Sequence, residues 1–417
     1  MAEPSGTRPA RRVLGVLLAA VLVGFTAQQL LTPILAPLSR ELRLTEVQLG
    51  VVVTVAAVVF TLGSLVWGRV VDRWGSRRVL LTGLGIAVVG MAGFGLSARL
   101  ALDSGWGTPA TLTALLATRS VLFGTGIGAV PVAALAYVSA ATEGEKERTR
   151  AVSLVGAAQA ISLILGPGIG GALAVADLLA PVYLAPVLLV AILVAVLVLV
   201  PGLDRTAPTD DTAGRVGPLD PRVRPFLLVG FLLFLSLGVM QVVLGFLVQD
   251  RLELDAGATA ASVGTAMVIT GLVLVAMQAA VVPRLGWSPA RLIRTGAPIA
   301  AAGFAVLALA GQLWLITVGL CVVAVGLGMA MPGYSAGATL RVQRSEQGAV
   351  AGLLNATTGA TFIVGPLLGT ALYPLGAAVP IWVSAGCCAV GAVVAVSGRA
   401  LSTPGRASSP LEGEIAG

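Results

Sequence analysis

Few side chains in this sequence could carry out acid–base, nucleophilic or metal chemistry. There is no histidine, which excludes histidine-based catalytic triads, imidazole metal ligands and imidazole proton shuttles. Lys146, the single lysine, follows Glu145 where a phosphate-binding P-loop requires glycine, so ATP hydrolysis by that route is excluded too. Cys321, Cys387 and Cys388 stand inside apolar runs at spacings that match no zinc or iron–sulfur site. The sequence therefore predicts no enzyme, no bound metal and no cofactor.

The remaining charged residues avoid the interiors of the apolar segments, with one exception. All 19 acidic residues fall at the ends of apolar segments or between them, whereas proton relays usually use carboxylates or histidines embedded in the membrane. Arg119 is the one charge inside an apolar segment, a costly position that by default indicates function. A side chain that reaches back to the lipid headgroups is the alternative for Arg119. We therefore expect a neutral or anionic substrate, and any proton coupling must use boundary groups such as Asp72, Glu41 or Asp250.

The composition identifies the elements that must position these residues. The chain has 417 residues, of which 57% are hydrophobic and 11% charged, whereas soluble domains carry about 25% charged residues. A chain this long and this apolar could not cover its core with polar surface in water, so it is predicted to be an integral membrane protein. About 20 apolar residues cross a bilayer as a helix. Twelve such segments occur, at 13–36, 47–67, 79–98, 110–138, 151–174, 180–200, 225–248, 259–282, 293–310, 313–338, 349–372 and 378–397.

Basic residues predict which ends of these helices face the cytoplasm. With the N-terminus inside, 21 of the 26 basic residues fall in cytoplasmic segments, four fall outside and Arg119 lies within a helix. Cytoplasmic loops of membrane proteins carry such an excess of lysine and arginine. We therefore expect a multi-pass protein of the cytoplasmic (inner) membrane with both termini in the cytoplasm. The net charge of +7 then meets anionic lipid headgroups and does not indicate a nucleic-acid partner.

The two halves of the chain repeat one another. Gly166-Pro167 in the fifth segment matches Gly365-Pro366 in the eleventh, and Gly126 in the fourth matches Gly326 in the tenth. Parallel repeats around a central site are typical of transporters. The fold class predicted is an all-α membrane protein with two pseudo-symmetric bundles of six helices. Its predicted parts are an N-terminal tail (1–12), a first bundle (13–200), a linker (201–224), a second bundle (225–398) and a C-terminal tail (399–417).

A charged motif follows the second segment. It reads Gly68-Arg-Val-Val-Asp72-Arg73-Trp-Gly75-Ser76-Arg77-Arg78. Gly68 permits close helix approach and Gly75 a tight turn. Asp72 can accept hydrogen bonds from the N-terminus of a neighbouring helix, such as the eleventh near Ala349. Such a contact would lock the two halves together on the cytoplasmic side while the cavity faces outward.

This motif resembles the loop signature of the major facilitator superfamily, G-x-x-x-D-R-x-G-R-R, with Ser76 in place of one basic residue. Together with the twelve segments and the central linker, the resemblance covers essentially the whole chain between its tails. It implies the twelve-helix fold of that superfamily. It also implies a gating role for Gly68, Asp72, Arg73, Gly75, Arg77 and Arg78. The alternative is that these arginines only set the topology.

The fifth segment contains Gly166-Pro167-x-x-Gly170-Gly171, which resembles the antiporter motif of drug/proton exporters in the same superfamily. Proline bends the helix and glycine lets it pack closely, so this geometry could seal the cavity against leak. A packing seam of small residues explains the pattern equally well. The resemblance implies protons as a coupling ion.

Polar and aromatic residues of several segments are candidates for the lining of the cavity. The superfamily has a fourth-helix arginine that Arg119 resembles, although Gly124 follows it at five residues, where the pattern has four. One residue turns a helix by about 100°, which leaves the equivalence of Arg119 open. The full set of candidates is Gln28, Gln29, Arg119, Gln159, Gln241, Tyr334, Asn355, Thr358 and Phe362. Hydrogen bonds between helices are the alternative role for each.

The sequence thus favours a secondary-active transporter that works by alternating access and exports small amphipathic molecules. Its expected partners are the lipid bilayer, a small-molecule substrate and protons, and a monomer is expected. The alternatives are an importer or facilitator of a polar metabolite, or a non-transporting sensor on the same fold. An intramembrane enzyme would need an activated nucleophile or a metal, for which the apolar segments supply neither histidine nor carboxylate.

Overall fold

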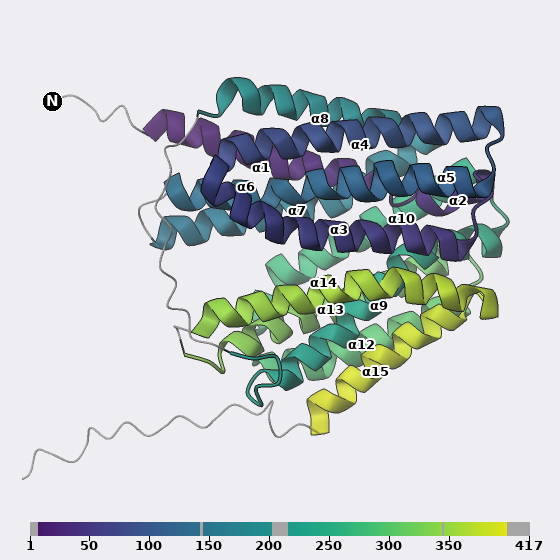
Figure 1. The fold of residues 1–417 in the computed structure, drawn as a ribbon. Helices are drawn as coiled ribbons and strands as arrows, with labels where there is room; N and C mark the ends of the chain where they lie inside the picture. Colours follow the sequence, from purple (N-terminus) through teal and green to yellow (C-terminus); the bar gives the residue numbers. More distant parts are fainter. Residues whose placement is uncertain (1–6, 142–144, 202–215, 344–345, 398–417) are drawn as a thin grey trace, which may run out of the picture.

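The structure, a computed structural model, describes residues 7–141, 145–201, 216–343 and 346–397, and these form helices without strands (Figure 1). Twelve helical segments of the described residues are long and apolar enough to cross a membrane, as predicted. The elements are α1 (Thr7–Gln29), α2 (Leu35–Glu41), α3 (Glu46–Trp74), α4 (Ser76–Ser104), α5 (Thr108–Leu115), η1 (Leu116–Leu122), α6 (Phe123–Ala141), α7 (Glu145–Ala174), α8 (Ala180–Leu199), α9 (Arg224–Leu252), α10 (Ala256–Ala276), η2 (Met277–Val281), α11 (Val282–Leu285), α12 (Pro289–Leu309), α13 (Leu313–Thr339), α14 (Gln347–Leu372), η4 (Tyr373–Leu375) and α15 (Val379–Ser397).

Two boundaries differ most from those predicted. The first membrane helix ends at Gln29, short of residue 36, and a turn leads into the separate short helix α2. Pro33 lies in this turn, where its ring disfavours helical backbone at the preceding residue. The second helix, α3, is longer than predicted and runs to Trp74, because its charged last turns leave the apolar segment without leaving the helix. Gly75 ends it with a φ of 81°, a conformation that favours glycine.

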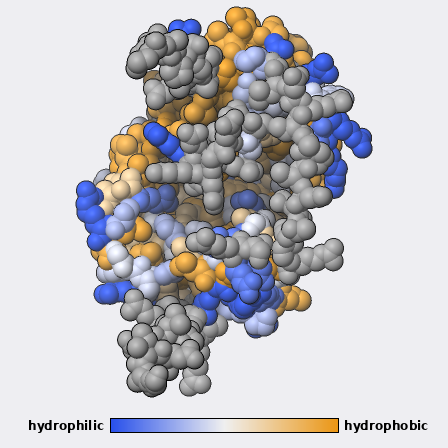
Figure 2. Space-filling view, turned by 90° about the vertical axis from the view of Figure 1, so that its left-hand side faces the viewer, coloured by the Kyte–Doolittle hydropathy of each residue, from blue (hydrophilic) through white to orange (hydrophobic). Residues whose placement is uncertain are grey.

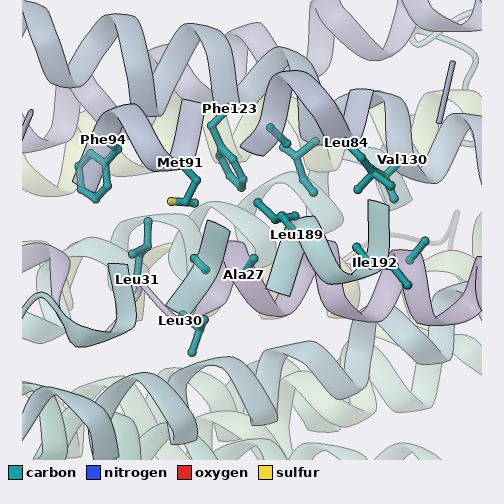
Figure 3. Packing of buried hydrophobic residues seen from close by; sticks show 14 of the residues in the cluster. Ala27, Leu30, Leu31, Leu84, Met91, Phe94, Phe123, Val130, Leu189 and Ile192 are labelled. Atoms are coloured by element: carbon teal, nitrogen blue, oxygen red, sulfur yellow. The ribbon is translucent and has the colours of Figure 1, made fainter. Parts of the chain in front are cut away.

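The helices form two bundles, each with its own apolar core. The first core consists mainly of side chains from α1, α4, α6 and α8, among them Met91, Phe123 and Leu189 (Figure 3). The second is built in the same way from α9, α12, α13 and α15. Gly126 of α6 packs against the backbone of α4, and its predicted counterpart Gly326 of α13 packs against the backbone of α12. The predicted internal repeat therefore describes equivalent helix contacts in the two bundles.

The two ends of the molecule differ in charge. We call the end at which α1 begins the basic end, because Arg12, Arg77, Arg150, Arg224, Arg291 and Arg341 lie there at helix termini. The opposite end carries Arg40, Arg43, Arg99 and Arg251. In Figure 1 the bundles lie close together at the opposite end and diverge toward the basic end.

Candidate transport pathway between the bundles

Helix α7 joins the two bundles through the predicted glycine motif. Gly166 and Gly170 face α1 and the turn after it, where a Cβ at Gly170 would lie 2.2 Å from the carbonyl oxygen of Leu30. Gly171 faces α10 of the other bundle, where a Cβ would lie 2.7 Å from the carbonyl oxygen of Ala260. Such distances exclude any side chain, so the glycines allow backbone-to-backbone contact on both sides of α7. The motif therefore lies in a packing seam, and this seam also closes the space between the bundles.

The repeated motif in α14 makes the corresponding contacts. Gly365 and Gly369 pack against α9 in their own bundle, and Thr370 lies against Gly50 of α3 in the first bundle. Farther along the same pair of helices, the Thr54 hydroxyl donates a 3.0 Å hydrogen bond to the carbonyl oxygen of Ile363. The α7–α10 and α3–α14 pairs thus form two matching interfaces between the bundles.

At the glycine positions, contact between the bundles continues to the middle of the helices. The glycine contacts nearest the basic end are Ile164 with Gly271 and Thr61 with Gly359. Beyond them, toward the basic end, a Cβ at Gly68, Gly156 or Gly352 would meet no atom within 4 Å among the described residues. Figure 2 views the basic end and shows the surface hollowed between the bundles. The structure is therefore closed at the opposite end and open at the basic end.

The predicted lining residues occupy different environments. Gln29 is buried, with its Cβ against Gly166, whereas Gln28 and Gln241 are half-buried. The Oε1 atom of Gln28 is fully buried and lacks a hydrogen bond to any described residue. Gln159 is also half-buried, and its carbonyl oxygen accepts a 2.6 Å hydrogen bond from Ser162. Of these residues, Gln29 therefore lies at the seam.

In the second bundle the candidates lie mainly on α14. Asn355 is exposed, whereas Thr358 and Phe362 are half-buried. Tyr334 of α13 is 3% exposed, its ring packs edge-on against Phe234, and its hydroxyl donates a 3.3 Å hydrogen bond to a carbonyl oxygen of α14. Tyr334 therefore holds helices of the second bundle together, which is the alternative role that its sequence position left open.

Arg119 lies in an unusual stretch of the fourth membrane helix. Residues Leu116–Leu122 form the π-helix η1, in which hydrogen bonds span five residues, as from the Phe123 amide to the Thr118 carbonyl oxygen. A π-turn takes in one extra residue, which accounts for the five-residue spacing between Arg119 and Gly124. The equivalence of Arg119 to the arginine of the superfamily pattern stays a prediction.

The Arg119 side chain is buried and forms no ion pair with any described residue. It is 7% exposed, its guanidinium carbon lies 5.2 Å from the centre of the Phe123 ring, and its Nε has no hydrogen-bond partner among the described residues. Phe123 belongs to the core of the first bundle (Figure 3). The Arg119 side chain, which is buried against this ring, therefore does not reach back to the headgroups. A buried positive charge of this kind favours anions in its surroundings.

The charged motif at the basic end lies mostly on a helix and not in a loop as predicted. Asp72 and Arg73 are exposed on the last turn of α3, and Gly75 alone forms the link to α4. Within the described part of the chain, Asp72 makes no ion pair or hydrogen bond. Arg78 is exposed, and Arg77 donates a 2.8 Å hydrogen bond to the carbonyl oxygen of Leu197 in α8. The predicted contact of Asp72 with α14 is thus not formed in this open-ended state.

A polar cluster closes the opposite end, and the sequence-based site prediction did not include it. Arg40 of α2 binds both carboxylate oxygens of Asp250 at the end of α9, with 2.9 Å between Nη2 and Oδ2. The Tyr373 hydroxyl donates a 2.6 Å hydrogen bond to the same carboxylate, and Glu46 of α3 lies 3.4 Å from Arg40. The hydrogen bond to Asp250 raises the pKa of Arg40. We call Arg40, Glu46, Asp250 and Tyr373 the outer latch, because they tie the two bundles together.

Little in the sequence indicates the outer latch. Arg40 and Asp250 stand 210 positions apart in sequence, and nothing in their local pattern differs from that of other loop charges. Asp250 was nevertheless one of the three boundary carboxylates considered for coupling, and among them it is the one that pairs across the bundles within the described residues.

The geometry described so far is that of a membrane transporter with one closed and one open end, and the comparisons name its family. The profile of the Major Facilitator Superfamily matches residues 17–353. The chain belongs to the Major Facilitator Superfamily and is a transporter of its twelve-helix kind.

Relatives of known identity match most of the chain. The chain is 26% identical over 365 residues to the class B tetracycline resistance protein of Escherichia coli, covering 85% of this chain and 86% of that protein. It is 24% identical over 374 residues to multidrug resistance protein 2 of Bacillus subtilis, covering 86% and 88%.

Solved structures show the same architecture. A bacterial homologue of the human lysosomal transporter Spinster, in an inward-facing and occupied conformation, matches with a TM-score of 0.74 at 12% identity over 94% of this chain and 97% of that one. The human organic anion transporter MFSD10 matches with a TM-score of 0.62 at 18% identity over 94% and 100%. At these identities the similarity establishes the fold.

Proposed function

We propose that this transporter is a secondary-active exporter of small amphipathic molecules that are neutral or anionic. It works as a monomer in the inner membrane by alternating access, with the basic end and both termini in the cytoplasm. The excess of arginine at the basic end supports this orientation. The relatives named as tetracycline and multidrug resistance proteins support export.

One observation carries the proposal: the bundle interfaces are closed from the opposite end to mid-membrane and open beyond Thr61 and Ile164. With the basic end in the cytoplasm, this is the state that takes up a substrate from inside. The similarity to a structure in an inward-facing conformation supports the same assignment. In the alternate state the outer latch opens, and Asp72 approaches the N-terminus of α14 near Ala349.

The distribution of charge supports the substrate class. Within the described membrane helices, carboxylates lie at helix ends, at Glu46, Asp72, Asp103 and Asp250. A cationic substrate at mid-membrane would therefore find no counter-charge on these helices, whereas an anionic one is favoured by the unpaired charge of Arg119.

Protons drive the exchange in this proposal. The glycine seam of α7 supports it, since a coupled exchanger must prevent leak between its bundles. The described membrane helices carry no carboxylate away from their ends, so the proton must be taken up at an end group. Asp72 and Asp250 are the carboxylates at the two ends of the pathway.

Everted membrane vesicles that contain the full chain test this function. With the lumen acidified, we expect accumulation of a neutral and of an anionic amphipathic dye, and no accumulation of a permanent cation of similar size. A protonophore should abolish the uptake. Vesicles from the same strain without the protein serve as the control.

Three results would contradict parts of the proposal. Strong uptake of the permanent cation, unchanged by Arg119→Leu, would refute the charge argument. Substrate leaving the lumen down the same gradient would show an importer. Uptake that the protonophore leaves intact would refute proton coupling alone.

A further inference from the structure

A crevice of about 980 Å³ lies at the basic end, on the first bundle and away from the bundle interfaces. Its walls come from the first turns of α1 and the last turns of α8. The apolar side chains that line it include Val13, Val16 and Ala19 of α1, and Ile192, Ala195 and Val198 of α8. A crevice of this composition suits a hydrocarbon chain.

Two arginines, Arg12 and Arg77, stand at the crevice, and none of the described residues that line it is acidic. Arg12 is exposed and Arg77 is half-buried. One nitrogen of Arg77 donates to the carbonyl oxygen of Leu197, while its Nε is buried without a hydrogen-bond partner among the described residues. A buried donor left unpaired is costly, so an acceptor at this position would be bound favourably. The positive charges select a negatively charged acceptor.

The crevice faces lipid. Helix α8 lies at the edge of the first bundle that is remote from the second bundle (Figure 1). Leu197, Val198 and Leu199 are 53%, 71% and 55% exposed, and exposed apolar side chains at the end of a membrane helix contact lipid. Arg12 begins one membrane span. Arg77 donates to Leu197, two residues before Leu199 ends another span. Both arginines therefore lie at the level of the headgroups.

We propose that this crevice binds one anionic phospholipid. Its phosphate accepts hydrogen bonds from Arg12 and from the unpaired Nε of Arg77, and one acyl chain lies between α1 and α8. The lipid thereby links the start of α1 to the junction of α3 and α4, which carries the gating motif. The assignment to the cytoplasmic leaflet rests on the proposed orientation, whereas the binding itself does not depend on transport.

Native mass spectrometry of the full chain in detergent tests the proposal, with phosphatidylglycerol as the anionic probe and phosphatidylcholine of the same acyl chains as the neutral one. We expect one phosphatidylglycerol to bind more tightly than phosphatidylcholine. Arg12→Gln and Arg77→Gln should each weaken phosphatidylglycerol binding about fivefold, since a basic residue near a membrane surface contributes about 1 kcal/mol to anionic lipid binding.

Two further variants distinguish lipid binding in the crevice from unspecific attraction to the basic surface. Arg78→Gln removes the same charge from the neighbouring residue, which is exposed and does not line the crevice, and should leave binding unchanged. Gly15→Leu places a side chain in the crevice, where a Cβ meets no atom within 4 Å, and should abolish binding without a loss of thermal stability.

Several outcomes would overturn the proposal. Equal weakening by Arg78→Gln and Arg77→Gln would mean unspecific attraction to the surface. Equal affinity for the two lipids would remove the role of charge. Displacement of the lipid by millimolar inorganic phosphate would mean that a free anion is sufficient. Binding that Gly15→Leu leaves intact would place the lipid elsewhere. None of these results depends on whether the protein exports its substrate.

Discussion

The two ends of this transporter show that the number of charges at an end does not decide whether it is closed. The basic end has most of the arginines, and among the described residues Arg222 pairs there with Asp220 and Glu346, which also belong to the second half of the chain. The opposite end has few arginines, but Arg40 reaches across to Asp250 of the other bundle. Closure therefore follows from pairing between bundles and from the glycine seams beneath the outer latch.

The largest expected effect comes from the seam. Gly170→Ala places a Cβ against the carbonyl oxygen of Leu30, and this overpacking should reduce stability by about 1 to 3 kcal/mol. Gly156→Ala, on the same helix near the basic end, meets no atom within 4 Å and is the matched control. Thermal unfolding in detergent measures the difference. Equal melting temperatures for the two variants would show that the closed seam is not rigid.

The outer latch should have the next largest effect. Asp250→Asn removes the charge that holds Arg40, and partly exposed ion pairs contribute up to about 1 kcal/mol. The population that is open at the opposite end should therefore rise roughly fivefold. Spin labels at Ser76 and Gln347 in a cysteine-free background would report this as shorter distances at the basic end. Acidifying the outer medium should act in the same direction, because protonation neutralises the carboxylate.

Asp103→Asn is the control for this experiment. Asp103 lies at the same end and pairs with Arg99 at 2.8 Å, but both residues belong to α4. Loss of that pair should leave the distances unchanged. If Asp103→Asn shifted them as much as Asp250→Asn does, closure would depend on total charge and not on pairing between bundles.

Asp72→Asn should have a smaller effect of opposite sign. Asp72 has no ion pair or hydrogen bond in the described part of this state, so its removal leaves the form that is open at the basic end unaffected. It should lower the population of the form that is closed at the basic end roughly twofold, because a carboxylate at an exposed helix N-terminus stabilises the helix by a comparable factor. The same spin labels should report longer distances at the basic end. In the double variant of Asp72→Asn and Asp250→Asn, the two opposite changes in distance should partly cancel. Shorter distances in the single variant would refute the gating role.

The smallest effect is expected at Arg222. Its hydrogen bonds lower the pKa values of Asp220 and Glu346, so both carboxylates stay ionised until the pH falls well into the acid range. Because this cluster lies within the second half of the chain, Arg222→Gln should leave the spin-label distances unchanged at neutral pH. A shift as large as that of Asp250→Asn would show that the cluster also holds the basic end open.

The sequence predicted the twelve helices, their pairing in two bundles and the repeated glycines, because these depend on local hydrophobicity and small residues at fixed spacing. It did not predict the outer latch, since the approach of Arg40 to Asp250 depends on how two separately folded bundles meet. The role of Tyr334 likewise depends on packing between helices that are distant in sequence. Its type suggested a surface for substrate, whereas its position against Gly230 and Phe234 makes it part of a core.

The π-helix around Arg119 has a consequence for chain length. A π-turn contains one residue more than the corresponding α-helical turn. Removal of one residue between Leu116 and Leu122 would convert it to a regular α-helix. The helical segments before and after it would then keep their orientation about the helix axis. Deletion of Val121, which is exposed, should therefore be tolerated, whereas deletion of a residue in α6 would rotate every later contact of that helix. Single-residue gain or loss in natural variants of this helix is accordingly expected to concentrate at residues 116–122.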